Sequence, residues 1–171
     1  EVRISMYDRG FLYGDAAYDI ARTFRHRPFR LAEHVDRLFR SLKYIGLDIG
    51  LTAQQVFDIT LEVFERNRKL LDPEDDFLLI QRISRGVGGF VPEGSPTMII
   101  HCAPIPFDRF VSHYQEGIHL ALVSTRRTPP QCLDPRAKLH NKLNHIQAEK
   151  EARAVDPQAF ALMLDLDGYV A

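Results

Sequence analysis

The chain has 171 residues, of which 45% are hydrophobic and 26% are charged, a balance typical of a folded globular protein rather than a disordered one. Its formal net charge of −1 at pH 7 gives no electrostatic reason to expect binding to nucleic acid or to an anionic membrane. No apolar run approaches the roughly 18 residues of a membrane span. The two cysteines, Cys102 and Cys132, form no CxxC motif, which favours a reduced, cytoplasmic setting.

The N-terminal part of the chain combines strand and helix patterns. Strand-like segments cover residues 2–7, 16–24, 77–84 and 96–103. Helical spacing of apolar residues predicts one helix over 32–45 and a second that begins after the N-cap Thr52 and stops at Asp72-Pro73. A glycine-rich loop, 86–94, joins the last two strands. Together these elements predict a two-layer α+β unit that ends near residue 105.

The C-terminal part of the chain predicts a second unit. Its expected elements are a short helix over 107–115, a strand over 117–125, a helix capped by Asn141 and a strand over 159–165. The helix after Asn141 is expected to bury Leu143, Ile146 and Ala152. We therefore expect two domains, residues 1–110 and residues 111–171.

The two ends of the sequence indicate a piece of a longer protein. The chain begins at Glu1 without an initiator methionine, already within a strand-like segment. It stops at Ala171, where residues 168–171 have the pattern of a hairpin strand that is just beginning. A missing signal peptide therefore carries no weight here.

Lys138 is the strongest candidate for covalent chemistry. It lies between Pro135 and the predicted N-cap Asn141, just ahead of a helix. Near the positive end of a helix the ammonium form of a lysine is disfavoured, which leaves some neutral amine to attack a carbonyl carbon. Most lysines are simply solvated, so the other motifs have to decide whether this one is different.

Arg37 and Tyr18 are candidate binding residues. A guanidinium anchored on a rigid helix, with His34 three residues earlier, suits bidentate binding of a phosphate. The alternative is a solvated helix face. A phenol on the strand over 16–24 can donate a hydrogen bond to a substrate or cofactor, although aromatic residues in strands mostly belong to the core.

The other motifs predict no metal and no nucleotide site. The histidines His101, His140 and His145 lack the spacing of metal ligands. The segment 165–168, Asp-Leu-Asp-Gly, predicts a tight turn rather than a calcium loop. The loop over 84–89 lacks the strand–turn–helix context of a dinucleotide site.

Four segments, in the expected order and spacing, resemble the class IV aminotransferases, which are pyridoxal-phosphate enzymes of the branched-chain and D-amino-acid aminotransferase type. They are DRGFLYGDAAYDIAR (8–22), FRLAEHVDRL (29–38), RAKLHNKLNHIQAEKEA (136–152) and ALMLDLDGYVA (161–171). The resemblance implies an α+β, two-domain, fold-type IV architecture. Its N-terminal domain is a small α/β sandwich, and its larger, mostly-β C-terminal domain is present only in part.

By this resemblance, Lys138 forms a Schiff base with pyridoxal 5'-phosphate, Arg37 binds the cofactor phosphate, and Tyr18 faces the substrate. Lys142 is a rival lysine, but the family's Lys-x-x-Asn pattern matches Lys138 and Asn141. The implied activity is a transamination between an amino acid, branched-chain or D-configured, or a chiral amine, and a 2-oxo acid. The resemblance also implies a homodimer, with Phe90 or Val91 reaching towards the neighbouring subunit's site.

Two features of the family have no match in this sequence. The glutamate that pairs with the pyridine nitrogen follows the equivalent of Tyr169-Val170-Ala171, where this sequence stops. The arginine–histidine pair that traps the substrate carboxylate in D-amino-acid aminotransferases has no clear match after Arg85. Two alternatives therefore stay open: an aminodeoxychorismate-lyase-like enzyme, and a non-catalytic binding module that retains the fold.

Overall fold

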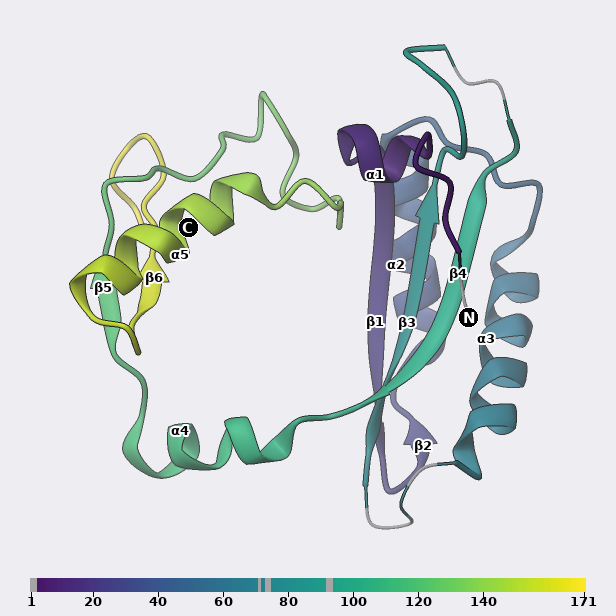
Figure 1. Cartoon of the computed structure of the whole chain (residues 1–171), viewed down its shortest axis with the longest axis horizontal. Helices are drawn as coiled ribbons and strands as arrows, with labels where there is room; N and C mark the ends of the chain where they lie inside the picture. The colour runs from purple at the N-terminus through teal and green to yellow at the C-terminus, as the bar shows by residue number, and fades with distance from the viewer. Residues whose placement is uncertain (1–2, 71, 73–74, 92–93) are drawn as a thin grey trace. The chain divides into compact units, whose positions relative to one another are not determined.

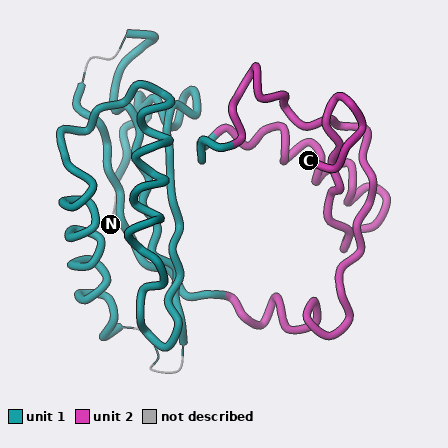
Figure 2. The backbone as a smooth tube through the Cα atoms, turned by 180° about the vertical axis from the view of Figure 1, so that it is seen from behind, with its two compact units in different colours: residues 1–105, 136–140 teal, residues 106–135, 141–171 magenta. Residues whose placement is uncertain are grey.

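The structure of the chain is a computed structural model (Figure 1), and it describes residues 3–70, 72, 75–91 and 94–171. The chain forms two compact units (Figure 2). The first unit contains residues 1–105 together with 136–140, and the second contains residues 106–135 and 141–171. The predicted domain boundary between residues 110 and 111 stays a prediction, because a compact unit is not by itself a domain that folds alone.

The first unit is built on a four-stranded antiparallel sheet with the order β2-β1-β3-β4 (Figure 1). Its strands are β1 (Ala16–Phe24), β2 (Arg27–Pro28), β3 (Phe77–Ser84) and β4 (Thr97–Pro104). The strands predicted over 16–24 and 77–84 have these bounds, and the one predicted over 96–103 is shifted by one residue. The sheet therefore follows the alternating pattern of the sequence closely.

Two helices cover one face of this sheet: α2 (Leu31–Tyr44) and α3 (Ala53–Arg68). Thr52 caps α3 as predicted, and it forms a capping box with Gln55. Alternate residues of β1 and β3 face the helices and are almost completely buried. They are Ala17, Asp19, Ala21, Thr23, Phe77, Leu79, Gln81 and Ile83. Val35, Leu38, Leu42, Val56 and Phe64 of the two helices are buried as well, so this layer is the core of the unit.

A short helix, α1 (Arg9–Tyr13), precedes the sheet where the sequence predicted a break after a strand. The predicted strand over 2–7 is wrong for residues 3–7, and residue 2 lies outside the described residues. The Asp8 carboxylate caps α1 by accepting the Gly10 N–H, and it also accepts hydrogen bonds from the hydroxyls of Ser84 and Thr97. Asp8 thus ties α1 to β3 and β4.

The second unit is smaller and pairs its strands in parallel. Its elements are η1 (Phe107–Arg109), α4 (Val111–Glu116), β5 (Leu120–Leu122), α5 (Leu143–Val155) and β6 (Phe160–Leu162). Ala148 and Ala152 of α5 are buried in a core with Ala121, Val123, Ala159 and Met163. None of the helices in the described part of the chain has the length and apolar character needed to cross a membrane.

Three predictions for the second unit need correction. Asn141 is not the N-cap of α5, because the helix begins at Leu143 after Lys142 and has no side-chain cap. Leu143 and Ile146 are 67% and 52% exposed, since the small residues Ala148 and Ala152 form the face that approaches the strands. Both strands are shorter than predicted. Beyond β5, the backbone N–H groups of Ser124 and Thr125 donate to the Glu151 carboxylate instead of to a neighbouring strand.

Candidate active site

The segment 136–140, which contains Lys138, belongs to the first unit although it is far in sequence from the strands of that unit (Figure 2). Residues 138–140 run along β1: the Tyr18 N–H donates to the Lys138 carbonyl oxygen at 3.0 Å, and the His140 N–H donates to the Ala16 carbonyl oxygen at 3.0 Å. The Leu139 side chain next to Lys138 is buried. The backbone of Lys138 is therefore fixed, and its side chain is the part that can move.

Ser41 connects Lys138 with Arg37 through helix α2. Its hydroxyl donates to the Arg37 carbonyl oxygen at 3.0 Å and accepts the Lys138 N–H at 2.9 Å. Ser41 is itself buried. A hydroxyl can donate one hydrogen bond and accept another, so serine suits this position. The two residues that the sequence singled out separately are thus held by one side chain.

The Tyr18 ring brings three basic side chains together. The Lys138 Nζ atom lies 4.3 Å from the centre of the ring, and the Arg82 guanidinium carbon lies 5.6 Å from it. The His140 ring meets the same ring edge-on, with 5.3 Å between the ring centres. Cations are attracted to the face of an aromatic ring at such distances. Tyr18 thus sits beside the amine of Lys138, and its predicted role toward a substrate stays a prediction.

Arg37 is held by a buried carboxylate on β1. Its Nε and Nη2 atoms donate to the two carboxylate oxygens of Asp19 at 2.7 and 2.8 Å. The Nδ1 atom of His34 lies 2.8 Å from the Oδ1 atom of Asp19. Burial raises the pKa of Asp19, but the hydrogen bonds from Arg37 and His34 outweigh it and place this pKa below its ordinary value. The hydrogen bonds to Asp19 likewise raise the pKa of Arg37. Arg37 is therefore a permanent cation.

The outer side of Arg37 faces a hollow of about 260 Å³. The residues that line this hollow are Phe29, Arg30, Glu33, His34, Arg37 and Arg40. The Arg37 side chain is 41% exposed, and its Nη1 atom makes no hydrogen bond to any residue that the structure describes. A guanidinium with an available donor at a largely basic hollow is suited to an anion such as a phosphate.

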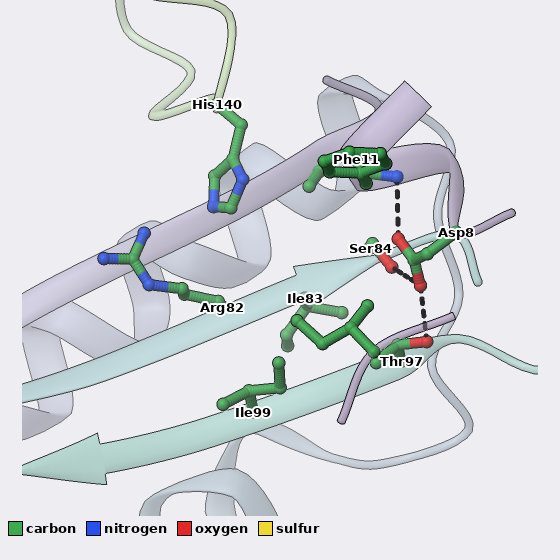
Figure 3. A pocket seen from close by; sticks show the side chains of 11 residues that line it. Asp8, Phe11, Arg82, Ile83, Ser84, Thr97, Ile99 and His140 are labelled. Carbon is green, nitrogen blue, oxygen red and sulfur yellow. Dashed lines mark hydrogen bonds between the residues drawn. The ribbon is translucent and has the colours of Figure 1, made fainter. Parts of the chain in front are cut away.

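A second cavity, also of about 260 Å³, opens on the face of the sheet opposite α2 and α3 (Figure 3). Its apolar wall contains Ile4, Phe11, Ala16 and Ile99. At one end the Asp8 carboxylate accepts hydrogen bonds from the hydroxyls of Ser84 and Thr97, as the dashed lines of Figure 3 mark. Arg82 and His140 also line this cavity. Because both of them contact Tyr18, the cavity lies next to the lysine.

The turn that leads into β1 is fixed by a second carboxylate, Asp15. It accepts hydrogen bonds from Arg9 and Arg85, and the Arg85 guanidinium also donates to the carbonyl oxygens of Ile45 and Gly46 just after α2. Burial raises the pKa of Asp15, but the hydrogen bonds from Arg85 and Arg9 outweigh it, so this pKa lies below its ordinary value of 3.8. This network fixes the start of β1 and therefore the position of Tyr18 on that strand.

We expect Asp15 to make the stability of the protein dependent on acid. A carboxylate with a lowered folded pKa contributes stability that is fully present above its unfolded value, near 3.8, and is lost as the pH falls through the folded value. Asp15→Asn should therefore lower the free energy of unfolding by about 1–3 kcal/mol at neutral pH, and by progressively less below about pH 4. Urea unfolding across a pH series measures this. A constant difference at every pH would contradict it.

Sequence reasoning did not identify several residues of this site. Asp19, Ser41, Arg82 and His140 each contact a predicted site residue or its backbone. One signal was present for Asp19, since a charged residue stood among the alternate residues Ala17, Ala21 and Thr23 that face the core. The others depend on which segments lie side by side, which the local pattern does not contain.

Comparison with solved structures first defines the class of fold. The branched-chain amino acid aminotransferase of Escherichia coli superposes with a TM-score of 0.88 at 23% identity, over 99% of this chain and 57% of that one. The branched-chain aminotransferase of the archaeon Thermoproteus uzoniensis, solved with norvaline, has a TM-score of 0.80 at 27% identity, over 100% of this chain and 57% of that one. The chain therefore has the fold of these enzymes, as the sequence predicted.

Residues 16–171 match the family described as amino-transferase class IV, and the chain belongs to this family. A Methanocaldococcus jannaschii protein assigned to the branched-chain amino-acid aminotransferases is 34% identical over 99% of this chain and 57% of its own length. The aminodeoxychorismate lyase of Bacillus subtilis is 30% identical over 98% of this chain and 56% of its own. The chain thus spans just over half the length of these relatives. Pyridoxal 5'-phosphate is the cofactor of the family, and this confirms the family and cofactor predictions.

Proposed function

We propose that this protein is an aminotransferase that moves an amino group between an amino acid and a 2-oxo acid. The observation that carries the proposal is the placement of Lys138, whose backbone is bonded to β1 and Ser41 and whose amine lies over Tyr18. Reaction with a carbonyl group requires a lysine whose backbone is fixed and whose flexible side chain can bring the amine to the carbonyl carbon. This lysine meets both requirements.

The residues of the site fit pyridoxal phosphate in two ways. The Lys138 amine is the group that would hold the aldehyde end, and Arg37, which lines a largely basic hollow, would hold the phosphate. The cofactor, when bound, serves as an electron sink for the bond that breaks at the substrate's α carbon. The protein has to supply the anchors and the proton transfers.

Lys138 would also move the proton between the α carbon and the cofactor once the substrate has replaced it. Its amine is a base on a flexible chain of four carbons, so after its release it can still reach the α carbon of the substrate. Its Nζ atom lies 4.3 Å from the centre of the Tyr18 ring, whose face attracts cations. With Tyr18 beside it, Lys138 would first hold the cofactor and then act as the acid and base.

The lining of the cavity in Figure 3 favours an amino acid with an apolar side chain as the substrate. Arg82 and His140 lie at the end near Tyr18, where they can meet a carboxylate, and apolar side chains such as Ile99 form the wall. A guanidinium binds a carboxylate through two hydrogen bonds. We therefore expect amino acids with aliphatic or aromatic side chains to react better than strongly polar ones.

The test is turnover by the full-length protein loaded with pyridoxal phosphate. With an apolar amino acid and 2-oxoglutarate, we expect glutamate and the new 2-oxo acid to appear in equal amounts, with reversible changes in the cofactor's absorbance. If no donor reacts while the cofactor binds normally, transamination is the wrong activity. If the protein shows no cofactor absorbance, a non-catalytic binding module is favoured instead.

One comparison favours a second candidate function, a lyase that acts on aminodeoxychorismate. The likeness to the lyase from Bacillus subtilis covers nearly the whole chain, and its identity is close to that of the archaeal relative. Such a lyase releases pyruvate without an amino acceptor, whereas a transaminase needs one. Pyruvate released from aminodeoxychorismate in the absence of any 2-oxo acid would support the lyase and count against transamination as the main activity.

We also propose that the protein is a homodimer, with the loop after β3 at the contact. Phe90 and Val91 of this loop are 88% and 73% exposed. Phe90 stacks on Tyr13 of α1, with 5.3 Å between the ring centres. The exposed side chains Phe11 and Tyr7 belong to the adjoining segment. Contiguous exposed apolar surface of this kind marks an interaction site.

Phe90→Ser is expected to weaken the dimer at least about 10-fold, because aromatic side chains carry a large share of interface energy. Light scattering at a series of protein concentrations measures the change. Leu70→Ser is the matched control, since Leu70 is a similarly exposed apolar residue (81%) next to α3, away from this loop. Equal effects of the two substitutions, or a monomer at every concentration, would count against a contact at Phe90.

A further inference from the structure

We propose that Asp19, together with His34, is a positioning residue that aims Arg37 at the phosphate of the cofactor. The inference rests on the proposed function, because it assumes that Arg37 binds that phosphate. Asp19 touches neither cofactor nor substrate in this scheme. It acts only through the guanidinium that it holds.

The geometry of the pair fixes which edge of the guanidinium faces outward. Asp19 is 0% exposed and uses both carboxylate oxygens, one for Nε and one for Nη2 of Arg37. A two-point contact between planar groups sets orientation as well as distance. With Nε and Nη2 turned inward, Nη1 is left for the hollow that Arg37 lines.

The carboxylate itself cannot rotate. Its Oδ1 atom accepts the Ile20 N–H at 2.7 Å, in addition to the contacts with His34 and Arg37 at 2.8 Å each. His34 is on the same helix as Arg37, and its Nδ1 atom also lies 3.4 Å from Nη2. The strand β1 and the helix α2 therefore both hold Asp19, and Asp19 in turn holds Arg37.

A carboxylate beside a phosphate site needs an explanation, because its charge repels the ligand. If Asp19 served only to neutralise Arg37, its removal would strengthen phosphate binding. If it positions Arg37, its removal frees a long side chain that must then be immobilised by the ligand, and binding weakens. The two roles predict opposite signs, so affinity can decide between them.

The experiment compares pyridoxal phosphate with pyridoxal, which lacks the phosphate, as ligands of the full-length protein. The readout is the ratio of the two affinities from absorbance titrations, and it is independent of turnover. For Asp19→Asn we expect this ratio to fall about 5- to 10-fold, with the affinity for pyridoxal unchanged. Asp76→Asn is the matched control, since Asp76 also binds β1 through Thr23 but lies at the far end of that strand. It should keep the wild-type ratio.

His34→Gln provides a second variant on a partly exposed residue, and it should lower the ratio about 2- to 3-fold even if Asp19→Asn does not fold. An unchanged or higher ratio in a folded Asp19→Asn protein, or an unchanged ratio in His34→Gln, overturns the positioning role. Arg37→Ala separates this failure from failure of the proposed function. If Arg37→Ala keeps the wild-type ratio, the phosphate assignment is wrong and this inference falls with it.

Discussion

Lys138→Ala is expected to reduce the proposed transamination by about 10⁴-fold or more, because in that proposal one substitution removes both the amine that holds the cofactor and the group that moves the α proton. The backbone of residue 138 should stay in place, since its hydrogen bonds to Tyr18 and Ser41 do not involve the side chain. Single-turnover assays measure the activity. Borohydride reduction and peptide mapping locate the lysine that carries the cofactor, and the variant should carry no label.

Lys142→Ala is the control for this prediction. Lys142 is the N-cap residue of α5 and lies four positions along the chain from Lys138. Its removal should leave both the covalent label and most of the activity. A pyridoxyl label on Lys142 in the wild-type protein, or full activity in Lys138→Ala, would overturn the assignment of Lys138.

The elements that the sequence predicted well are those whose pattern is local. In β1, buried and less buried residues alternate for most of the strand, so its period identifies it without knowledge of the partner. Thr52 caps α3 with a box that closes within three residues. The stripe of Val35, Leu38 and Leu42 likewise lies on one face of one helix. Each of these signals is complete within a single segment.

The parts that were missed depend on pairs of distant segments. The Asp8 carboxylate ends the expected strand because it caps α1 and binds Thr97, 89 residues away. The N-cap of α5 was predicted wrongly because Asn141 was assumed to belong to the helix that follows it. Residues 138–140 instead run along β1. No local period records such a pairing.

The candidate site likewise contains residues that local motifs predicted and residues that only the structure revealed. Lys138, Arg37 and Tyr18 were named from motifs, and the structure places Lys138 and Tyr18 in contact. The residues that hold them, Asp19 and Ser41, come from a strand and a helix and act across the layer between them. Their roles became visible only when the helix lay on the sheet. The motifs therefore named the candidate residues, and the structure showed which neighbours hold them.

Arg37→Ala is expected to lower the affinity for pyridoxal phosphate about 10- to 150-fold, because it removes the proposed charge-assisted contact with the phosphate, worth roughly 1.5–3 kcal/mol. The structure adds a second effect. Arg37 pairs with a fully buried carboxylate, so its loss leaves Asp19 with fewer hydrogen bonds and should destabilise the cofactor-free protein by about 1–3 kcal/mol. Cofactor titration and urea unfolding measure the two effects separately.

The double substitution Arg37→Ala with Asp19→Asn distinguishes these effects. Replacing the carboxylate removes the uncompensated charge, so much of the lost stability should return, whereas the affinity for the cofactor should stay low because the phosphate still has no anchor. Arg66→Ala is the control, since Arg66 forms an exposed ion pair with Glu62 on α3 and should change neither quantity appreciably. If the double variant regained cofactor affinity along with stability, Arg37 would be a structural residue and the phosphate would have to bind elsewhere.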